Sequence, residues 1–312
     1  MEEWVLAVDL GATNVRVGLV NAQGQVAVTV RTPTPQEGPE AVVETIAKLV
    51  EEVRVRARRV PDWMGVGVPG PLSVEEGIVH APPNLPGWRE VPLRALLEGR
   101  LGLAVVLEND ANAAAVGEWW RGAARGARHV LYITWSTGIG GGVIVDGRLY
   151  RGASDTAGEI GHLTVDPLGP LCPCGRRGHL EGIAAGRAIA RAAREALGRG
   201  EPSVLGGQPE ITARMVAEAA RNGDALARRV LERAAGMMGL AVGSMLNLLN
   251  PEVVVIGGGV ARSWDLVEGP LVEAARRSAF AVPFQAARIV PGALGDDAGL
   301  VGAAYIALQA RR

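Results

Sequence analysis

The sequence has few of the residues that build disulfide scaffolds or nucleic-acid-binding surfaces. It contains two cysteines and four histidines in 312 residues, and Lys48 is its only lysine. Its 32 basic and 33 acidic residues give a net charge of −1, so we expect no nucleic-acid partner. One residue separates the cysteines, a spacing that rarely suits a disulfide, and free thiols favour a cytoplasmic protein.

Long hydrophobic runs are also absent, so we expect no membrane partner. The longest nearly apolar stretch, Met237 to Leu249, is interrupted by glycine, serine and Asn247 and is too short to cross a bilayer. Its Gly239 and Gly243 form a G-x-x-x-G spacing, which we interpret as close packing of a helix in a soluble protein. The acidic start MEEWVLAVDL runs directly into a strand pattern, so we expect no secretory signal.

Glycine is abundant, at 43 of 312 residues, and part of it marks an internal duplication. A strand, a glycine loop, a strand, a turn and a third strand begin at Trp4, and the same series returns from His129. Helical patterns begin near Pro39, Ala111 and Ala298 and dominate residues 182–249. The alternation predicts an α/β protein with two duplicated halves and a ligand-binding cleft between them.

Glycine loops follow three of the predicted strands, at 9–14, 137–142 and 257–259. Such loops bring backbone N–H groups close to phosphate oxygens, and Asp9 beside the first could hold Mg²⁺. Each loop taken alone could be an ordinary turn. The chain has no Walker A loop, and the G-x-G-x-x-G at 65–70 contains Pro69 and is followed by Pro71 and a turn instead of the helix that a dinucleotide site needs.

Two further segments carry residues suited to chemistry. Asn109 and Asp110 stand between a strand and a helix, where they could cap the helix or present a carboxylate as a general base. His162, Cys172, Cys174 and His179 have the residue types of a closed, tetrahedral structural zinc site. Two isolated buried cysteines are the alternative, but the polar, turn-rich loop around them favours zinc.

These segments, read in order, resemble the ROK family of sugar kinases and repressors. The resemblance rests on DLGATN, ENDAN, TGIGGG, EIGH, CPCGRRGHLE and VIGGG, and it extends from about residue 5 to about residue 305. It implies an actin/hexokinase-like fold of duplicated ribonuclease-H-like domains. We expect a smaller N-terminal domain at 1–112 plus 299–312 and a larger C-terminal domain with the zinc loop at 113–298.

The resemblance also implies roles for individual residues. Asp110 is the expected general base, and the expected sugar-binding residues are Gly70, Asn84, Asn109, Asp110, Glu159, His162 and Glu181. The expected ATP-binding residues are Asp9, Gly11, Thr13, Asn14, Thr137 and Gly138 for the phosphates and Gly257, Gly258 and Gly259 near the adenosine. His162 would serve both zinc and sugar, one ring nitrogen on each. The family commonly has a third cysteine where this chain has His179, which makes the fourth zinc ligand the departure to test.

The activity that the resemblance implies is ATP-dependent phosphorylation of a hexose at the 6-hydroxyl, with glucose as the first expectation and Mg²⁺ as cofactor. Fructose, mannose or an N-acetylated amino sugar remain alternative substrates. A sugar-responsive repressor is a remote alternative, because Asp9 falls within the first ten residues and leaves no room for a helix-turn-helix domain. We also expect a homo-oligomer, either a dimer or a tetramer.

Overall fold

The computed structural model describes residues 3–311, which divide into two compact units. Among the described residues, unit 1 holds those up to Arg128, Gly142–Gly158 and those from Ala293 onward, and unit 2 holds His129–Gly141 and Glu159–Gly292. The predicted domain bounds, 1–112 plus 299–312 and 113–298, stay a prediction. A duplicated domain and a compact unit can begin and end at different residues.

Unit 1 is built on a five-stranded sheet with the order β3-β2-β1-β4-β7. β1 pairs antiparallel with β2 and parallel with β4, and β4 pairs parallel with β7. The strands, including a separate hairpin of β5 and β6, are β1 (Trp4–Leu10), β2 (Asn14–Asn21), β3 (Val26–Pro33), β4 (Trp63–Val68), β5 (Leu72–Ser73), β6 (Ile78–Val79) and β7 (Ala104–Asn109).

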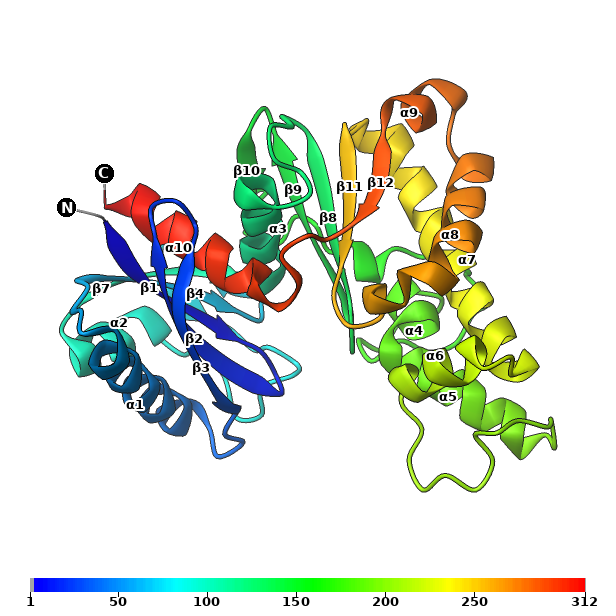
Figure 1. Cartoon of the computed structure of the whole chain (residues 1–312), viewed down its shortest axis with the longest axis horizontal. Coiled ribbons are helices and arrows are strands. Elements are labelled where there is room, and N and C mark those ends of the chain that lie inside the picture. The colour runs from blue at the N-terminus through cyan, green and yellow to red at the C-terminus, as the bar shows by residue number, and fades with distance from the viewer. Residues whose placement is uncertain (1–2, 312) are drawn as a thin grey trace. The chain divides into compact units, whose positions relative to one another are not determined.

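Helices cover both faces of this sheet because apolar residues occupy both sides of β1. Leu6 and Val8 belong to the core under α1 (Pro39–Ala57) and α2 (Leu93–Leu101). Val5 and Ala7 pack on the opposite face against α10 (Ala298–Ala310), the red helix beside the blue strands in Figure 1.

Glycine brings the helices of unit 1 very close to their neighbours. A Cβ on Gly65 of β4 would overlap the Ala303 carbonyl of α10, and one on Gly302 would overlap the Ala113 carbonyl of α3 (Asp110–Arg121). Part of the glycine excess is therefore required by helix packing rather than by turns.

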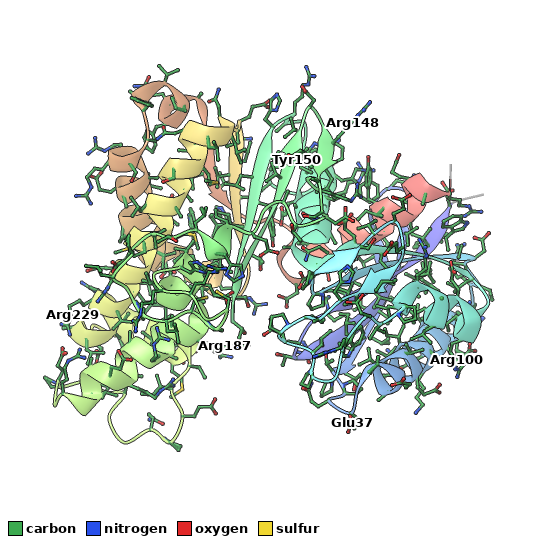
Figure 2. The ribbon with its side chains drawn as sticks, turned by 180° about the vertical axis from the view of Figure 1, so that it is seen from behind. Glu37, Arg100, Arg148, Tyr150, Arg187 and Arg229 are labelled. Carbon is green, nitrogen blue, oxygen red and sulfur yellow. The ribbon has the colours of Figure 1, made fainter. Side chains whose placement is uncertain are left out.

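The second sheet repeats the strand order of the first, as β10-β9-β8-β11-β12, and this confirms the predicted duplication. Its strands are β8 (Val130–Trp135), β9 (Ile139–Val145), β10 (Arg148–Tyr150), β11 (Val253–Gly257) and β12 (Arg288–Pro291). β11 pairs parallel with both β8 and β12. The edge strand β10 is short and exposes Arg148 and Tyr150 (Figure 2), which protects the edge from pairing with another chain.

Helices of unit 2 form the layer beside β11, where α7 and α8 lie side by side (Figure 1). The α-helices are α4 (Leu180–Ala184), α5 (Gly186–Gly198), α6 (Ala213–Arg221), α7 (Ala225–Leu249), α8 (Trp264–Ser278) and α9 (Ala281–Ala286); the 3₁₀ turns of the chain are η1 (Ile160–His162), η2 (Ala261–Ser263) and, in unit 1, η3 (Gly295–Asp297). A Cβ on Gly239 would overlap the Leu271 carbonyl, and one on Gly243 would lie 2.6 Å from Ser278 Cβ. The predicted close packing at this G-x-x-x-G is confirmed. Within residues 3–311, no helix is both long enough and apolar enough to cross a membrane.

Candidate active site

Three parallel strands of unit 1 bring several predicted site residues to one edge of the sheet. Asp9 of β1 is in register with Gly67 of β4, and Val68 of β4 is in register with Asn109 of β7. Because parallel strands end on the same side, Asp9, Asn109 and Asp110 share the carboxyl edge, a usual place for ligands in α/β folds.

Asp9 lies between a cation and the first turn of α10. Its Oδ2 atom is 4.0 Å from Arg16 NH1, and Arg16 NH2 also pairs with Asp297 Oδ1 at 2.6 Å. A Cβ on Gly299 would lie 2.9 Å from the Asp9 Cγ, so a side chain there would displace the Asp9 carboxylate. Burial raises the pKa of Asp9, Arg16 opposes this and Asp296 adds to it. The partly exposed carboxylate of Asp9 fits Mg²⁺, which keeps waters and uses few protein oxygens.

The turn after Asp9 is held by its own backbone and by a residue that the sequence reasoning missed. Gly11 N–H donates to the Asn14 carbonyl at 2.9 Å, and the Thr34 hydroxyl donates to the Gly11 carbonyl at 2.6 Å. Thr34 N–H also donates to the Thr13 carbonyl at 2.9 Å. Thr13 and Asn14 are exposed, which leaves them accessible to a ligand.

Asn109 caps α3 while its amide nitrogen lies beside another predicted sugar-binding residue. Its Oδ1 accepts hydrogen bonds from Ala111 N–H at 3.0 Å and Asn112 N–H at 3.1 Å. A Cβ on Gly70 would lie 3.2 Å from Asn109 Nδ2. Asp110 begins α3, and its Oδ1 accepts from Ala111 N–H at 2.8 Å. The helix cap is therefore Asn109, and capping uses only the oxygen of its amide.

The predicted nucleotide loops of unit 2 lie against each other at the ends of β8 and β11. A Cβ on Gly258 would lie 2.6 Å from the Trp135 carbonyl, and one on Gly259 would lie 3.6 Å from Ser136 Oγ. Residue 258 has a φ of +88°, which glycine adopts without strain. Gly186 N–H, at the start of α5, donates to the Ser136 carbonyl at 2.8 Å.

The start of α5 also reaches the next residue of this loop. Arg187, labelled in Figure 2, is the second residue of α5, and its N–H donates to the Thr137 carbonyl at 3.5 Å. The helix thereby holds the loop before Gly138 in place.

Glu181 contacts this same glycine loop. Its Oε2 accepts a hydrogen bond from Ile139 N–H at 2.9 Å, and a Cβ on Gly138 would lie 2.6 Å from that oxygen. The structure thus brings together Glu181, predicted for sugar, and Gly138, predicted for phosphate. A side chain at 138 would displace this carboxylate.

His162, Cys172, Cys174 and His179 form one cluster in unit 2, with ligand atoms all within 4.8 Å of one another. The two His Nδ1 atoms are 3.3 Å apart, Cys174 Sγ is 3.2 Å from His179 Nδ1, and Cys172 Sγ is 4.0 Å from His162 Nδ1. Tetrahedral ligands at zinc distances are separated by about 3.3–3.8 Å. The cluster therefore has the residue types and spacing of a structural zinc site.

The loop around the cluster fixes its ligands and adjusts their protonation. Gly175 N–H donates to the Cys172 carbonyl at 2.9 Å, and Gly178 has a φ of +72°. Burial raises the pKa of the Cys172 thiol to about 11. Burial also lowers the pKa of His179, with His162 and Arg176 lowering it further, which favours the neutral imidazole that a metal needs.

The other nitrogen of His162 points toward a second predicted sugar-binding residue. His162 Nε2 is 3.9 Å from Glu159 Oε2, while Nδ1 faces the cluster. Burial raises the pKa of Glu159, His162 lowers it and Glu181 raises it. Asn84 belongs to unit 1, where it is exposed in a turn in which Leu85 N–H donates to the Pro82 carbonyl at 3.2 Å.

Sequence reasoning missed the residues that support the predicted ones through contacts between distant segments. Thr34 holds the Gly11 turn, Gly299 makes room for Asp9, and the buried Glu108 precedes Asn109. The two aspartates and two glycines of GDDAG, where α10 begins, were a usable signal for Gly299. Thr34 gave none.

Two sheets of identical strand order, with glycine loops at strand ends in both, are the architecture of the actin/hexokinase-like class. A family model described as the ROK family matches residues 5–310, and the chain belongs to that family. Both findings confirm the fold and the family that the sequence predicted.

Three relatives illustrate the similarity. A glucokinase of Thermotoga maritima is 40% identical over 307 residues, which is 97% of this chain and 96% of that protein. A ROK hexokinase from Thermus thermophilus is 39% identical, with a TM-score of 0.83 over 100% of this chain and 99% of that one. A ROK family glucokinase from Streptomyces griseus, solved with glucose and AMPPNP, is 35% identical, with a TM-score of 0.87 over 99% of this chain and 100% of that one.

Proposed function

We propose that this chain is an ATP-dependent hexose kinase that phosphorylates glucose at its 6-hydroxyl. The observation that carries the proposal is the shared strand edge of unit 1, where Asp110 begins α3 on the same side of the sheet as Asp9. Glucokinases among the relatives, one of them solved with glucose and an ATP analogue, support the choice of sugar and nucleotide.

In unit 1, Asp110 is the general base of the proposed reaction. Its carboxylate takes the proton of the sugar 6-hydroxyl as that oxygen forms a bond to the γ-phosphorus, and the bond from the γ-phosphorus to the bridging oxygen of ADP breaks. Asn109 donates from Nδ2 to a sugar hydroxyl while Oδ1 caps α3, and Gly70 leaves space beside that amide. Asp9 would hold Mg²⁺, which would neutralise phosphate charge.

In unit 2, the loop at Thr137 and Gly138 presents backbone N–H groups to phosphate oxygens, as the Gly11–Asn14 turn does in unit 1. Gly257, Gly258 and Gly259 lie along the adenosine. Polar side chains bind sugar hydroxyls, and we assign this role to Asn84, Glu159, His162 and Glu181.

The metal cluster is proposed to bind a structural zinc ion through His162, Cys172, Cys174 and His179. Zinc on His162 Nδ1 would fix the ring so that Nε2 stays available as a donor on the side of Glu159. The two thiols are free cysteines, one buried and one exposed, which is consistent with metal binding in a reducing cytoplasm.

A homo-oligomer, dimer or tetramer, completes the proposal. Apolar side chains on the surface of unit 2 support it: Phe280 and Val282 of the α9 segment are each 77% exposed, and Leu248 at the end of α7 is 73% exposed. Light scattering after size-exclusion chromatography measures the assembly directly.

The proposed activity is tested by ADP release from Mg²⁺–ATP with a panel of sugars: glucose, fructose, mannose, N-acetylmannosamine and N-acetylglucosamine. We expect glucose to give the highest kcat/KM and glucose 6-phosphate to be the product. A higher kcat/KM with another sugar would change the substrate, and absence of sugar-dependent ADP release with all of them would overturn the kinase proposal.

A further inference from the structure

Glu108 is a buried carboxylate directly before the Asn109–Asp110 pair, and the proposed reaction does not use it. It is the penultimate residue of β7 and is only 1% exposed. Burying a carboxylate costs free energy unless hydrogen bonds and a cation compensate for it. Glu108 has both kinds of partner: Asn109 and Asn112 donate hydrogen bonds to it, and Arg151 supplies the cation.

One oxygen of Glu108 connects the end of β7 to the first turn of α3. Oε1 accepts from Asn109 N–H at 3.0 Å and from Asn112 Nδ2 at 3.0 Å. The carbonyl oxygen of the Asn112 side chain is buried without a partner among the described residues, so the bond to Glu108 orients this amide. Asp110 lies between the two residues that Glu108 holds.

The other oxygen binds Arg151. Oε2 accepts from Arg151 Nε at 2.8 Å and is 2.7 Å from Arg151 NH2. Arg151 begins a loop that its own carbonyl closes by accepting from Ala157 N–H at 3.0 Å, and the loop is held a second time where Asp155 Oδ2 accepts from Val74 N–H at 3.0 Å. The loop that carries the Arg151 guanidinium is therefore itself held in place by two hydrogen bonds.

Only a carboxylate satisfies this arrangement. Each oxygen of Glu108 faces two donors, and the contacts found for it within residues 3–311 include no acceptor. A glutamine would turn its NH₂ group toward one pair of donors whichever way its amide were placed. The site thus selects a fully accepting, negatively charged side chain, together with the guanidinium that compensates its charge.

We propose that Glu108 and Arg151 are positioning residues that fix the strand-to-helix corner from which Asn109 and Asp110 project. The role in catalysis rests on the proposed function, in which Asp110 takes the proton of the sugar hydroxyl. Displacement of a reacting group by about 1 Å costs on the order of 100-fold in rate, so loosening this corner lowers turnover without removing any group that touches the sugar.

The test compares Glu108→Gln, Arg151→Met and the double variant Glu108→Gln/Arg151→Met. We expect each single change to lower kcat by about 100-fold and to raise the Kd for glucose by much less, because Asn109 is only one of the proposed sugar-binding residues. The double variant regains about tenfold in kcat over Arg151→Met, because no uncompensated buried charge remains. Arg151→Lys, which keeps the charge and loses the fork, gives an intermediate kcat.

Arg128→Met is the matched control, since Arg128 NH2 pairs with Asp146 Oδ1 at 2.8 Å in the same unit but both side chains are well exposed. It should leave kcat unchanged. Unchanged kcat in both single variants, a kcat that falls only in step with glucose binding, or a double variant no better than Arg151→Met would each overturn the proposal.

Amide hydrogen exchange tests the positioning without any activity. Exchange at residues 109–112 should be faster in Glu108→Gln and Arg151→Met than in Arg128→Met, and equal exchange in all three would overturn the positioning role. If the unaltered protein phosphorylates no sugar, the proposed function fails, and hydrogen exchange still decides whether Glu108 and Arg151 hold the corner.

Discussion

Two glycines on one helix of unit 2 should respond in opposite directions to the same substitution. Gly236 and Gly239 are both inside α7, three positions apart. A Cβ on Gly236 would meet no heavy atom within 4 Å, whereas one on Gly239 would overlap the Leu271 carbonyl and lie 2.7 Å from Ala274 Cβ, both on α8. The pair therefore separates helix propensity from helix packing.

The magnitudes follow from these distances. Gly236→Ala should stabilise the protein by about 0.5–1 kcal/mol, because alanine loses less backbone entropy in a helix interior. Gly239→Ala gains the same propensity, but α8 must move away from a backbone overlap. Overpacking costs typically 1–3 kcal/mol, and we expect a cost of about 3 kcal/mol or more here because the overlapping atom belongs to the rigid backbone of α8. After the gain in helix propensity is subtracted, Gly239→Ala should destabilise the protein by about 2 kcal/mol.

Urea unfolding followed by circular dichroism and tryptophan fluorescence measures both variants. Trp264 begins α8 and reports on the displaced helix itself. The midpoints should lie on opposite sides of the midpoint of the unaltered protein, and the free energies of unfolding of the two variants should differ by about 3 kcal/mol. A Gly239→Ala protein as stable as Gly236→Ala would refute the close contact between α7 and α8.

Two further predictions concern the site residues. Burial raises the pKa of Asp9, so its ionised carboxylate costs stability above that pKa, and the cost disappears at acidic pH. Asp9→Asn should therefore raise the Tm of the ligand-free protein at pH 8, and the difference in Tm should shrink as the pH falls toward the ordinary pKa of aspartate. A lower Tm for Asp9→Asn at pH 8 would contradict this. His179→Ala should lower zinc per chain by atomic absorption and His179→Cys should keep it, since thiolate and imidazole both bind zinc; unchanged zinc content and affinity in His179→Ala would remove His179 from the ligands.

Much of the fold follows from local patterns in the sequence. The apolar spacing and Pro39 predicted α1, and the repeated strand-loop-strand series predicted the internal duplication that the two sheets of the same order confirm. The helix α2 was missed because only Leu93 and Leu97 are buried on it and no side chain caps its start. A short helix with so little periodicity gives no signal above that of a loop.

The candidate site was predictable where one motif carries the chemistry. Asn109 and Asp110 were identified with both of their possible roles, and the structure assigns the helix cap to Asn109. The contacts of Glu108 with Arg151 and of Glu181 with Ile139 join segments more than forty residues apart. Register and side-chain direction set such contacts, and neither can be read from a single sequence.

Turnover by Asp110→Asn tests the central claim most directly. The variant keeps the shape of the side chain, and Asp146→Asn, which changes an exposed aspartate of the same unit, is the control. We predict that Asp110→Asn binds glucose with nearly unchanged Kd while kcat for glucose 6-phosphate formation falls by about 10³-fold. A kcat within tenfold of that of the unaltered protein would contradict the assignment of Asp110 as the base.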